Sequence, residues 1–172
     1  MGGEDDRYDE NDDRDAVAPL GGGGISLLWN AFGGYDFVMS VTQGETYWRA
    51  SGMTDAMIAY YNAMPTWMYV PWVLGVWGAV AGSVLLLMRN KLAVPAFALS
   101  VVGAVVSLAY GLLNPIPKPE PSGLGGLLIY REAYPKEMAL YQTMTIMPYV
   151  IVVIAAFLVW YAWTMGKKST IR

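Results

Sequence analysis

Two polar side chains stand out in an otherwise apolar stretch near the start of the chain. Asn30 and Asp36 both fall within residues 25–42, whose other members are mostly apolar or small. A carboxyl group in a partly dry site can take up a proton. We expect Asn30 to hydrogen-bond to another helix, because an unsatisfied amide is costly in lipid. Arg49 and Arg131 are candidate partners for the Asp36 carboxylate, so these four residues predict a polar pocket that binds a proton or a substrate.

A structural role is the simpler explanation for Asp36. An acidic residue inside a membrane span is expensive, though less so near an interface. Asp36 lies about six residues from the far end of its stretch, where its carboxylate can reach the lipid headgroups. We therefore favour an ion pair or an interfacial acid over a transport role, and unchanged transport by Asp36→Asn would exclude the latter.

The composition excludes the catalytic machinery that depends on histidine or cysteine. The 172 residues contain neither type. Nucleophilic triads, thiol chemistry, Cys/His zinc sites, haem held by His or Cys and iron–sulfur clusters are therefore excluded. The remaining acids and bases show no recognisable catalytic spacing. We expect no enzymatic activity, no metal site and no cofactor.

The charges divide the chain into an acidic tail and a mildly basic apolar body. Residues 1–20 contain eight acids and two arginines, a net charge of −6, whereas the remainder carries +3. The tail has too few apolar residues to offset the entropy of ordering. We predict that residues 1–24 are disordered, with Gly21–Gly24 as a flexible joint, and that the tail mainly aids solubility.

Three uncharged stretches of the body are long enough to cross a lipid bilayer. A transmembrane helix needs about 20 mostly apolar residues, and residues 66–88, 92–114 and 143–165 each provide 23. Residues 25–42 are shorter and more polar, and we count them as a fourth span; a surface-lying or re-entrant helix is the alternative. The sequence predicts an all-α polytopic membrane protein, with four transmembrane helices in an antiparallel bundle over residues 25–165.

The basic residues set the orientation that we expect in the membrane. Arg89 and Lys91 join the second and third spans, and residues 166–172 form a basic tail after the last one. These two places hold five of the nine basic residues of the body and no acid. Basic residues favour the cytoplasmic side. The link and the C-terminus are therefore predicted to be cytoplasmic, and with four spans the N-terminus is too.

Small residues recur at helical spacing along the second and third spans. They are Gly75, Gly78 and Gly82 in the second span, and Gly103, Ser107 and Gly111 in the third. Such stripes let helices approach closely. In lipid, where the hydrophobic effect does not drive helices together, this close packing favours their association. Because a three-residue link joins the two spans, we expect them to run antiparallel and to pack on each other. A subunit interface is the alternative use of the stripes.

The two connections on the predicted outer side differ in character. Residues 54–64 show apolar spacing typical of a helix, with Thr54 as N-cap, Asp55 suited to the helix dipole and Pro65 after its end. We expect a short helix lying on the outer membrane face. Residues 115–143 begin with alternating prolines that favour an extended segment. This long connection is either a functional loop or an insertion.

Several motifs resemble a family of small proteobacterial inner-membrane proteins. They are Leu28-Trp29-Asn30-Ala31-Phe32-Gly33-Gly34-Tyr35-Asp36, Pro65-x-Trp67, Gly75-Val76-Trp77-Gly78 with Gly82-Ser83, and Phe97-x-Leu99-Ser100-x-x-Gly103. The resemblance covers roughly residues 25–110 well and the last span loosely, whereas the acidic tail and the proline-rich loop do not match. The family is of uncharacterised function and is sometimes labelled "sugar transporter". The resemblance implies four helices in a bacterial inner membrane, not a substrate.

Two functions of different classes are compatible with these features. The first is a small homo-oligomeric transporter-like protein for a small solute, because four helices alone leave little room for a solute path. The second is a non-catalytic accessory or assembly subunit of a larger membrane complex, bound through the small-residue stripes and the acidic tail. The expected partners are the lipid bilayer and a second copy or another membrane protein, and not nucleic acid. A polar cavity at Asp36 and Asn30 would favour transport, and a solid core with an exposed face of small residues would favour the accessory role.

Overall fold

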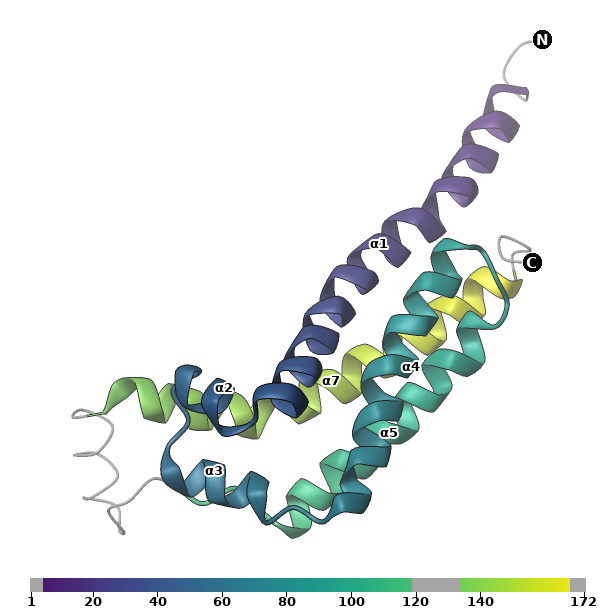
Figure 1. Ribbon diagram of the computed structural model, residues 1–172. Coiled ribbons are helices and arrows are strands. Elements are labelled where there is room, and N and C mark those ends of the chain that lie inside the picture. Colours follow the sequence, from purple (N-terminus) through teal and green to yellow (C-terminus); the bar gives the residue numbers. More distant parts are fainter. Residues whose placement is uncertain (1–4, 119–133, 168–172) are drawn as a thin grey trace.

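All secondary structure in the described part of the chain is helical (Figure 1). The computed structural model describes residues 5–118 and 134–167, with side chains from residue 21 onward. The helices are α1 (Asp5–Gln43), α2 (Glu45–Ala50), α3 (Asp55–Asn62), the 3-10 turn η1 (Thr66–Met68), α4 (Tyr69–Leu87), α5 (Ala93–Leu113) and α7 (Pro135–Lys167). α1 packs on α4, α4 on α5, and α5 on α7. The all-α prediction is confirmed for these residues.

Three of the described helical segments are long and apolar enough to cross a membrane. They are Thr66–Leu87, Ala93–Leu113 and Pro135–Lys167. The first two match the predicted spans to within a residue at each end. The third begins eight residues before the predicted start at residue 143, because the polar turns that precede the span continue the same helix. α1 is not among the three, since glycines and polar residues such as Asp36 dilute its apolar stretch.

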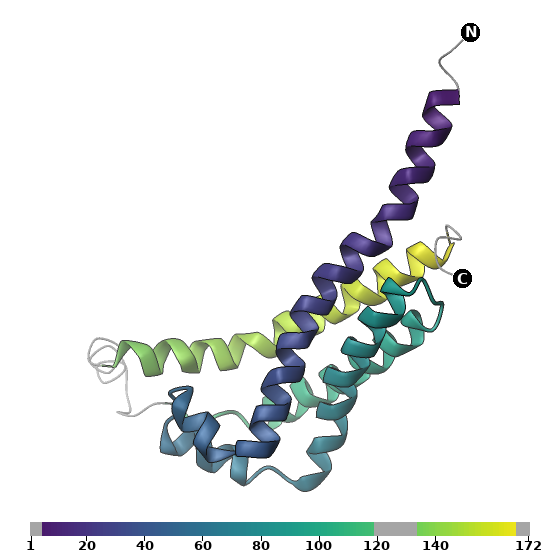
Figure 2. The same cartoon turned by 45° about the horizontal axis from the view of Figure 1, so that its top comes forward.

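α1 is one long helix that projects beyond the other helices at its N-terminal end (Figure 2). At about 1.5 Å per residue, its 39 residues extend for about 58 Å. The sequence predicted a disordered tail and a flexible glycine joint over residues 1–24. The structure instead continues the helix through the glycines as far as Asp5. Acidic residues near the start suit the positive end of the helix dipole.

Close packing explains why the glycine segment is helical. A Cβ atom at Gly22 would lie 2.5 Å from Cε1 of Tyr161, and one at Gly23 would lie 2.8 Å from Cγ of Leu87. With glycine at both positions, α1 passes close to α7 and α4 without displacing the Tyr161 and Leu87 side chains. The contacts that depend on this approach favour the helix over the flexible joint that composition alone predicted.

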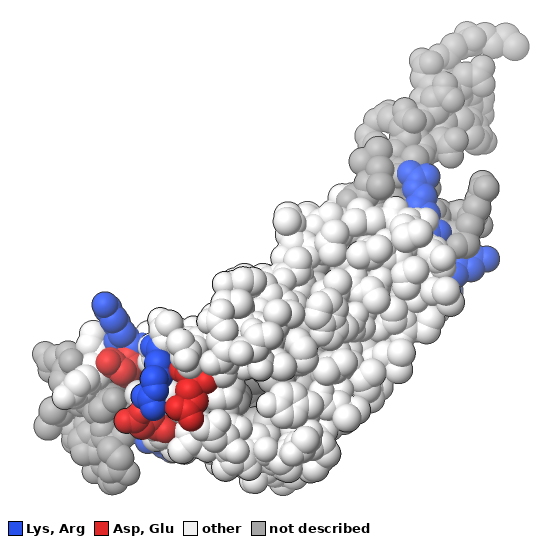
Figure 3. Space-filling model, in the orientation of Figure 1, with Lys and Arg blue, Asp and Glu red and all other residues white. Residues whose placement is uncertain are grey.

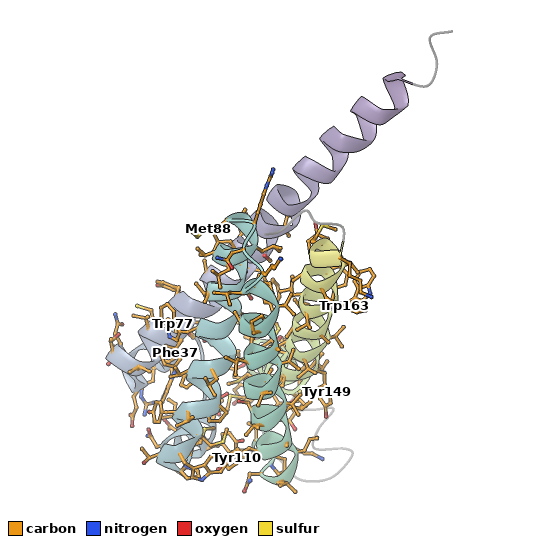
Figure 4. All side chains as sticks on the ribbon, turned by 90° about the vertical axis from the view of Figure 1, so that its right-hand side faces the viewer. Phe37, Trp77, Met88, Tyr110, Tyr149 and Trp163 are labelled. Carbon is orange, nitrogen blue, oxygen red and sulfur yellow. The ribbon has the colours of Figure 1, made fainter. Side chains whose placement is uncertain are left out.

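The centre of the hydrophobic core lies where α4, α5 and α7 meet. Its members are Leu86, Ala93, Phe97, Leu158, Ala162 and Met165. Phe97 and Leu86 are completely buried. Aromatic contacts join α1 to α4 further along, since the Phe37 ring lies 4.8 Å from Trp72 and 6.3 Å from Trp77 (Figure 4). Most other large apolar side chains of these helices face outward.

Charged side chains gather at the two ends of the molecule, and the middle is uncharged on the face shown (Figure 3). One end, the basic end, holds Arg89 and Lys91 between α4 and α5 and Lys167 at the end of α7. The other end, the mixed end, holds acids and bases together, among them Glu45, Arg49 and Asp55. An apolar belt between charged ends is the distribution that a bilayer requires.

The short helices α2 and α3, here called the cap layer, cover the mixed end. The chain reverses after α1 at Gly44, whose φ of 51° favours glycine. The helix predicted over residues 54–64 is present as α3, and Thr54 is its N-cap, with Oγ1 accepting the N–H of Met57 at 3.4 Å. α2 was not predicted, and it changes which residues meet at this end.

Candidate functional site

Asn30 ties α1 to α4 through its side-chain amide. Its Nδ2 donates to Oγ of Ser83 at 2.9 Å and to the carbonyl oxygen of Ala79 at 3.3 Å. Ser83 is completely buried and donates its own hydroxyl to the same carbonyl at 2.9 Å. The prediction that Asn30 bonds to another helix is confirmed. Its amide is engaged in a helix contact inside the molecule.

Asp36 is half-buried near the mixed end and pairs with a tyrosine. The hydroxyl of Tyr47 donates to Oδ1 of Asp36 at 2.8 Å. This hydrogen bond to a carboxylate raises the pKa of the Tyr47 phenol, with burial and the negative charge adding to the effect. Residue spacing does not indicate Tyr47 as the partner of Asp36, because their meeting depends on the reversal at Gly44, which brings α2 back over α1.

The predicted pairing of Asp36 with Arg49 is wrong. Nη1 of Arg49 lies 2.6 Å from Oδ1 of Asp55, and Nη2 lies 3.6 Å from Oε2 of Glu45. Residues two apart on a helix do not face the same way, so α2 cannot direct both Tyr47 and Arg49 at Asp36. The other candidate partner, Arg131, lies outside the described residues.

The cap layer is fastened to α1 and to itself by side-chain contacts. Nε1 of the buried Trp48 donates to Oγ of Ser40 at 3.2 Å. The Trp48 ring lies 5.6 Å from Tyr61, and burial, with smaller contributions from Tyr60 and the Asp36 charge, raises the pKa of the Tyr61 phenol to about 12. These contacts make the cap layer a packed part of the structure.

Four of the predicted small residues lie between α4 and α5. A Cβ at Gly78 would be 3.1 Å from N of Ser100, and one at Gly82 would be 2.7 Å from Cδ1 of Phe97. One at Gly103 would be 2.5 Å from N of Gly75. The positions pair in opposite order along the two helices, which therefore run antiparallel. Hydroxyl Oγ of Ser100 adds a hydrogen bond of 2.7 Å to the carbonyl of Gly75.

The other two residues of the third-span stripe behave differently. Ser107 is only partly buried. Gly111 has no atom within 4 Å of where its Cβ would be. The helical spacing predicts a packing contact at Gly111, but no described residue makes that contact.

Two apolar grooves open on the surface of the packed helices. One, of about 390 Å³, lies between Trp67, Val70 and Leu74 on one side and Val102 and Val106 on the other. The second, here called the α1–α7 groove, has about 340 Å³ and is lined by Ile25, Ser26 and Trp29 of α1 and by Ile154, Phe157 and Tyr161 of α7. Neither groove includes Asn30, Asp36 or Arg49. Neither groove therefore provides the polar pocket that transport would need.

In the part of the chain that the structure describes, no group of three or more acidic side chains gathers in a way that could hold a metal ion. Fold and contacts define a helical protein with three helices that could cross a membrane. Comparison with models of known families, with curated proteins and with solved structures finds no match to this chain.

Proposed function

We propose that α1 is a fourth span and that the chain crosses a bacterial inner membrane as an antiparallel four-helix bundle. The Asn30 amide, a costly group near the middle of the proposed span, is satisfied by α4. On its other side α1 presents large apolar side chains, with Ile25, Leu28 and Phe32 all more than 70% exposed. The family resemblance of residues 25–110 supports the inner membrane as the location.

The proposed orientation places the basic end in the cytoplasm. Arg89, Lys91 and Lys167 lie there, whereas the mixed end balances bases with acids. An excess of basic residues favours the cytoplasmic side. With four spans, the N-terminal extension of α1 and the C-terminus are then both cytoplasmic.

We propose that the protein is a non-catalytic accessory or assembly subunit of a membrane complex. The observation that carries this proposal is the projection of α1 past α4, α5 and α7 (Figure 2). The projecting part of α1 begins at Asp5 and contains seven of the eight acids of residues 1–20, since Glu4 lies outside the described residues. A charged helix that extends into the cytoplasm offers a surface for a basic partner. Support also comes from Asn30 and Asp36, which are engaged in internal hydrogen bonds.

The test is purification of the full chain from its native membrane in mild detergent, with mass determination and identification of bound subunits. We expect an unrelated subunit in fixed stoichiometry, lost when the acids of residues 4–15 are changed to Asn and Gln. Changing Arg7 and Arg14 to Gln is the matched control, which keeps the acids and should keep the partner. A purified species that contains only copies of this chain would contradict the proposal.

A homo-oligomeric transporter is the second candidate, favoured by one observation. The Asp36 carboxylate is half-buried and accepts its hydrogen bond from a neutral phenol, and no ion pair joins it to a described cation. Ionisable residues inside a membrane span often mark the path of a transported ion or substrate. Liposomes containing the protein and a pH-sensitive dye should then show proton movement in a glucose or sucrose gradient, lost in Asp36→Asn. Equal proton movement in both proteins, or none, would contradict this role.

A further inference from the structure

The α1–α7 groove has walls that suit hydrocarbon. Ile25 and Phe157, on opposite walls, are 74% and 53% exposed, so the groove is open along its length. The hydroxyl of Ser26 is buried and donates its proton to the carbonyl of Gly23 at 3.0 Å, so it offers no free donor to a polar ligand. A volume of about 340 Å³ falls within the range of about 300–1,000 Å³ seen for small-molecule sites.

The groove is short and lies beside the basic end. It extends from Gly22 to Trp29 along α1, which at 1.5 Å per residue is about 10 Å. A partner helix that crosses the bilayer would need a contact along most of the roughly 30 Å core. The groove is therefore too short to seat such a helix, but it matches one stretch of a lipid tail.

Positive charge at the adjoining end fits a lipid phosphate. Gly22 lies at one end of the groove, and the next residue, Gly23, packs beside Leu87. Arg89 and Lys91 follow Leu87 within four residues. On the other helix Lys167 comes six residues after Tyr161, about 9 Å further along the axis. The Lys167 ammonium lies 3.5 Å from the centre of the Trp163 ring, the interfacial arrangement typical of a span end.

We propose that the α1–α7 groove binds one acyl chain of a membrane phospholipid, whose phosphate lies at the basic end. The proposal rests on the insertion of α1 proposed above, because only then does the groove face lipid. The lipid fills the space that α1 and α7 leave between them beside the Gly22–Tyr161 contact. It would thereby stabilise α1, the most polar of the four helices, against α7.

The test is native mass spectrometry of the full chain in mild detergent with added phosphatidylglycerol. Ile25→Trp fills the groove, and Leu28→Trp is the matched control, since Leu28 is equally exposed on α1 and does not line the groove. We expect one retained lipid in the unchanged chain and in Leu28→Trp, and about tenfold less in Ile25→Trp. Equal thermal unfolding midpoints of the two variants establish that both are folded.

Several results would overturn the proposal. Equal lipid retention by Ile25→Trp and Leu28→Trp would mean non-specific lipid only, and a lipid-free dimer would assign the groove to a second copy. Changing Lys91 and Lys167 together to Gln should lower retention several-fold, and no change would contradict the place of the phosphate. Cysteine labelling at Gly3 tests the insertion of α1 separately, so failure of the four-span arrangement is distinguishable from failure of the lipid site.

Discussion

The approach of α4 and α5 at Gly103 allows a quantitative prediction. A Cβ added there would lie 2.5 Å from N and 2.9 Å from Cα of Gly75, and would also press on the carbonyl oxygen of Pro71. All three atoms belong to the backbone, so no side-chain rotation can relieve the overlap. In Gly103→Ala the two helices must move apart, which also strains the hydrogen bond from Ser100 to Gly75.

Gly111→Ala is the control on the same helix, because its Cβ would meet no atom within 4 Å. Both changes replace glycine by alanine inside α5, so both gain the same helix propensity, about 1 kcal/mol. The difference between the two variants therefore isolates the overlap at Gly103. Overpacking of this kind costs about 1–3 kcal/mol, so Gly103→Ala should be less stable than Gly111→Ala by that amount.

The assay is reversible unfolding of the full chain in mixed micelles with increasing SDS, followed by tryptophan fluorescence. Gly111→Ala should be at least as stable as the unchanged chain. Unfolding free energies of the two variants that agree within about 0.5 kcal/mol would mean that the close α4–α5 contact at Gly103 is absent.

Three further predictions concern single contacts. In a double-mutant cycle, Asn30→Ala and Ser83→Ala should couple by about 0.6–1.7 kcal/mol in unfolding free energy, as interhelical hydrogen bonds in membrane proteins do. Additive effects of the two changes would contradict the hydrogen bond between α1 and α4. Arg89 adopts a φ of 55° directly after α4, a conformation that costs other residues about 1–2 kcal/mol relative to glycine. Arg89→Gly should therefore be more stable than Arg89→Ala by that amount, and equal unfolding free energies would count against the strain. Because burial raises the pKa of Tyr61 to about 12 from 10.0, the neutral phenol stabilises the fold fully below pH 10, and this stability is lost between pH 10 and 12. Unfolding midpoints measured by near-ultraviolet circular dichroism should fall less over this range in Tyr61→Phe, and parallel curves would contradict the burial of that phenol.

The spans at α4 and α5 were predictable because their signal is local. An uncharged stretch of sufficient length reads as a membrane helix whatever surrounds it, and the spacing of Gly75, Gly78 and Gly82 already indicated a packed face. The need of Asn30 for a partner also followed from the cost of an unsatisfied amide. The identity of that partner, Ser83, did not follow, because it depends on how α1 lies against α4.

The errors arose where tertiary geometry overrides sequence spacing. The attraction of opposite charges predicts a pair of Asp36 with Arg49, but the helical phase of α2 directs the Tyr47 hydroxyl at Asp36 instead. Gly111 continues the stripe of Gly103, yet its neighbour Tyr110 already contacts Trp67 in the turn η1, before α4 begins, and a Cβ at Gly111 would meet no neighbouring helix. The spacing of residues within one helix does not show where its partner helix begins.

The glycine-rich segment shows the same limit for composition. Consecutive glycines are typical of a flexible joint because they lose the most entropy on ordering. Gly22 and Gly23 nevertheless lie in a helix, where they allow close contact with Tyr161 and Leu87. The advantage of that approach depends on α7 and α4, both distant in the sequence.

The four-span arrangement can be tested by determining the side of the membrane on which the N-terminus lies. The chain has no cysteine, so single cysteines can be placed at Gly3, Ser51 and Ser169 and treated with a membrane-impermeant maleimide on intact cells. Four spans predict that Ser51→Cys is labelled, whereas Gly3→Cys and Ser169→Cys react only after permeabilisation. Labelling of Gly3→Cys on intact cells, together with Ser51→Cys, would show that α1 does not cross the membrane and would contradict the four-span arrangement.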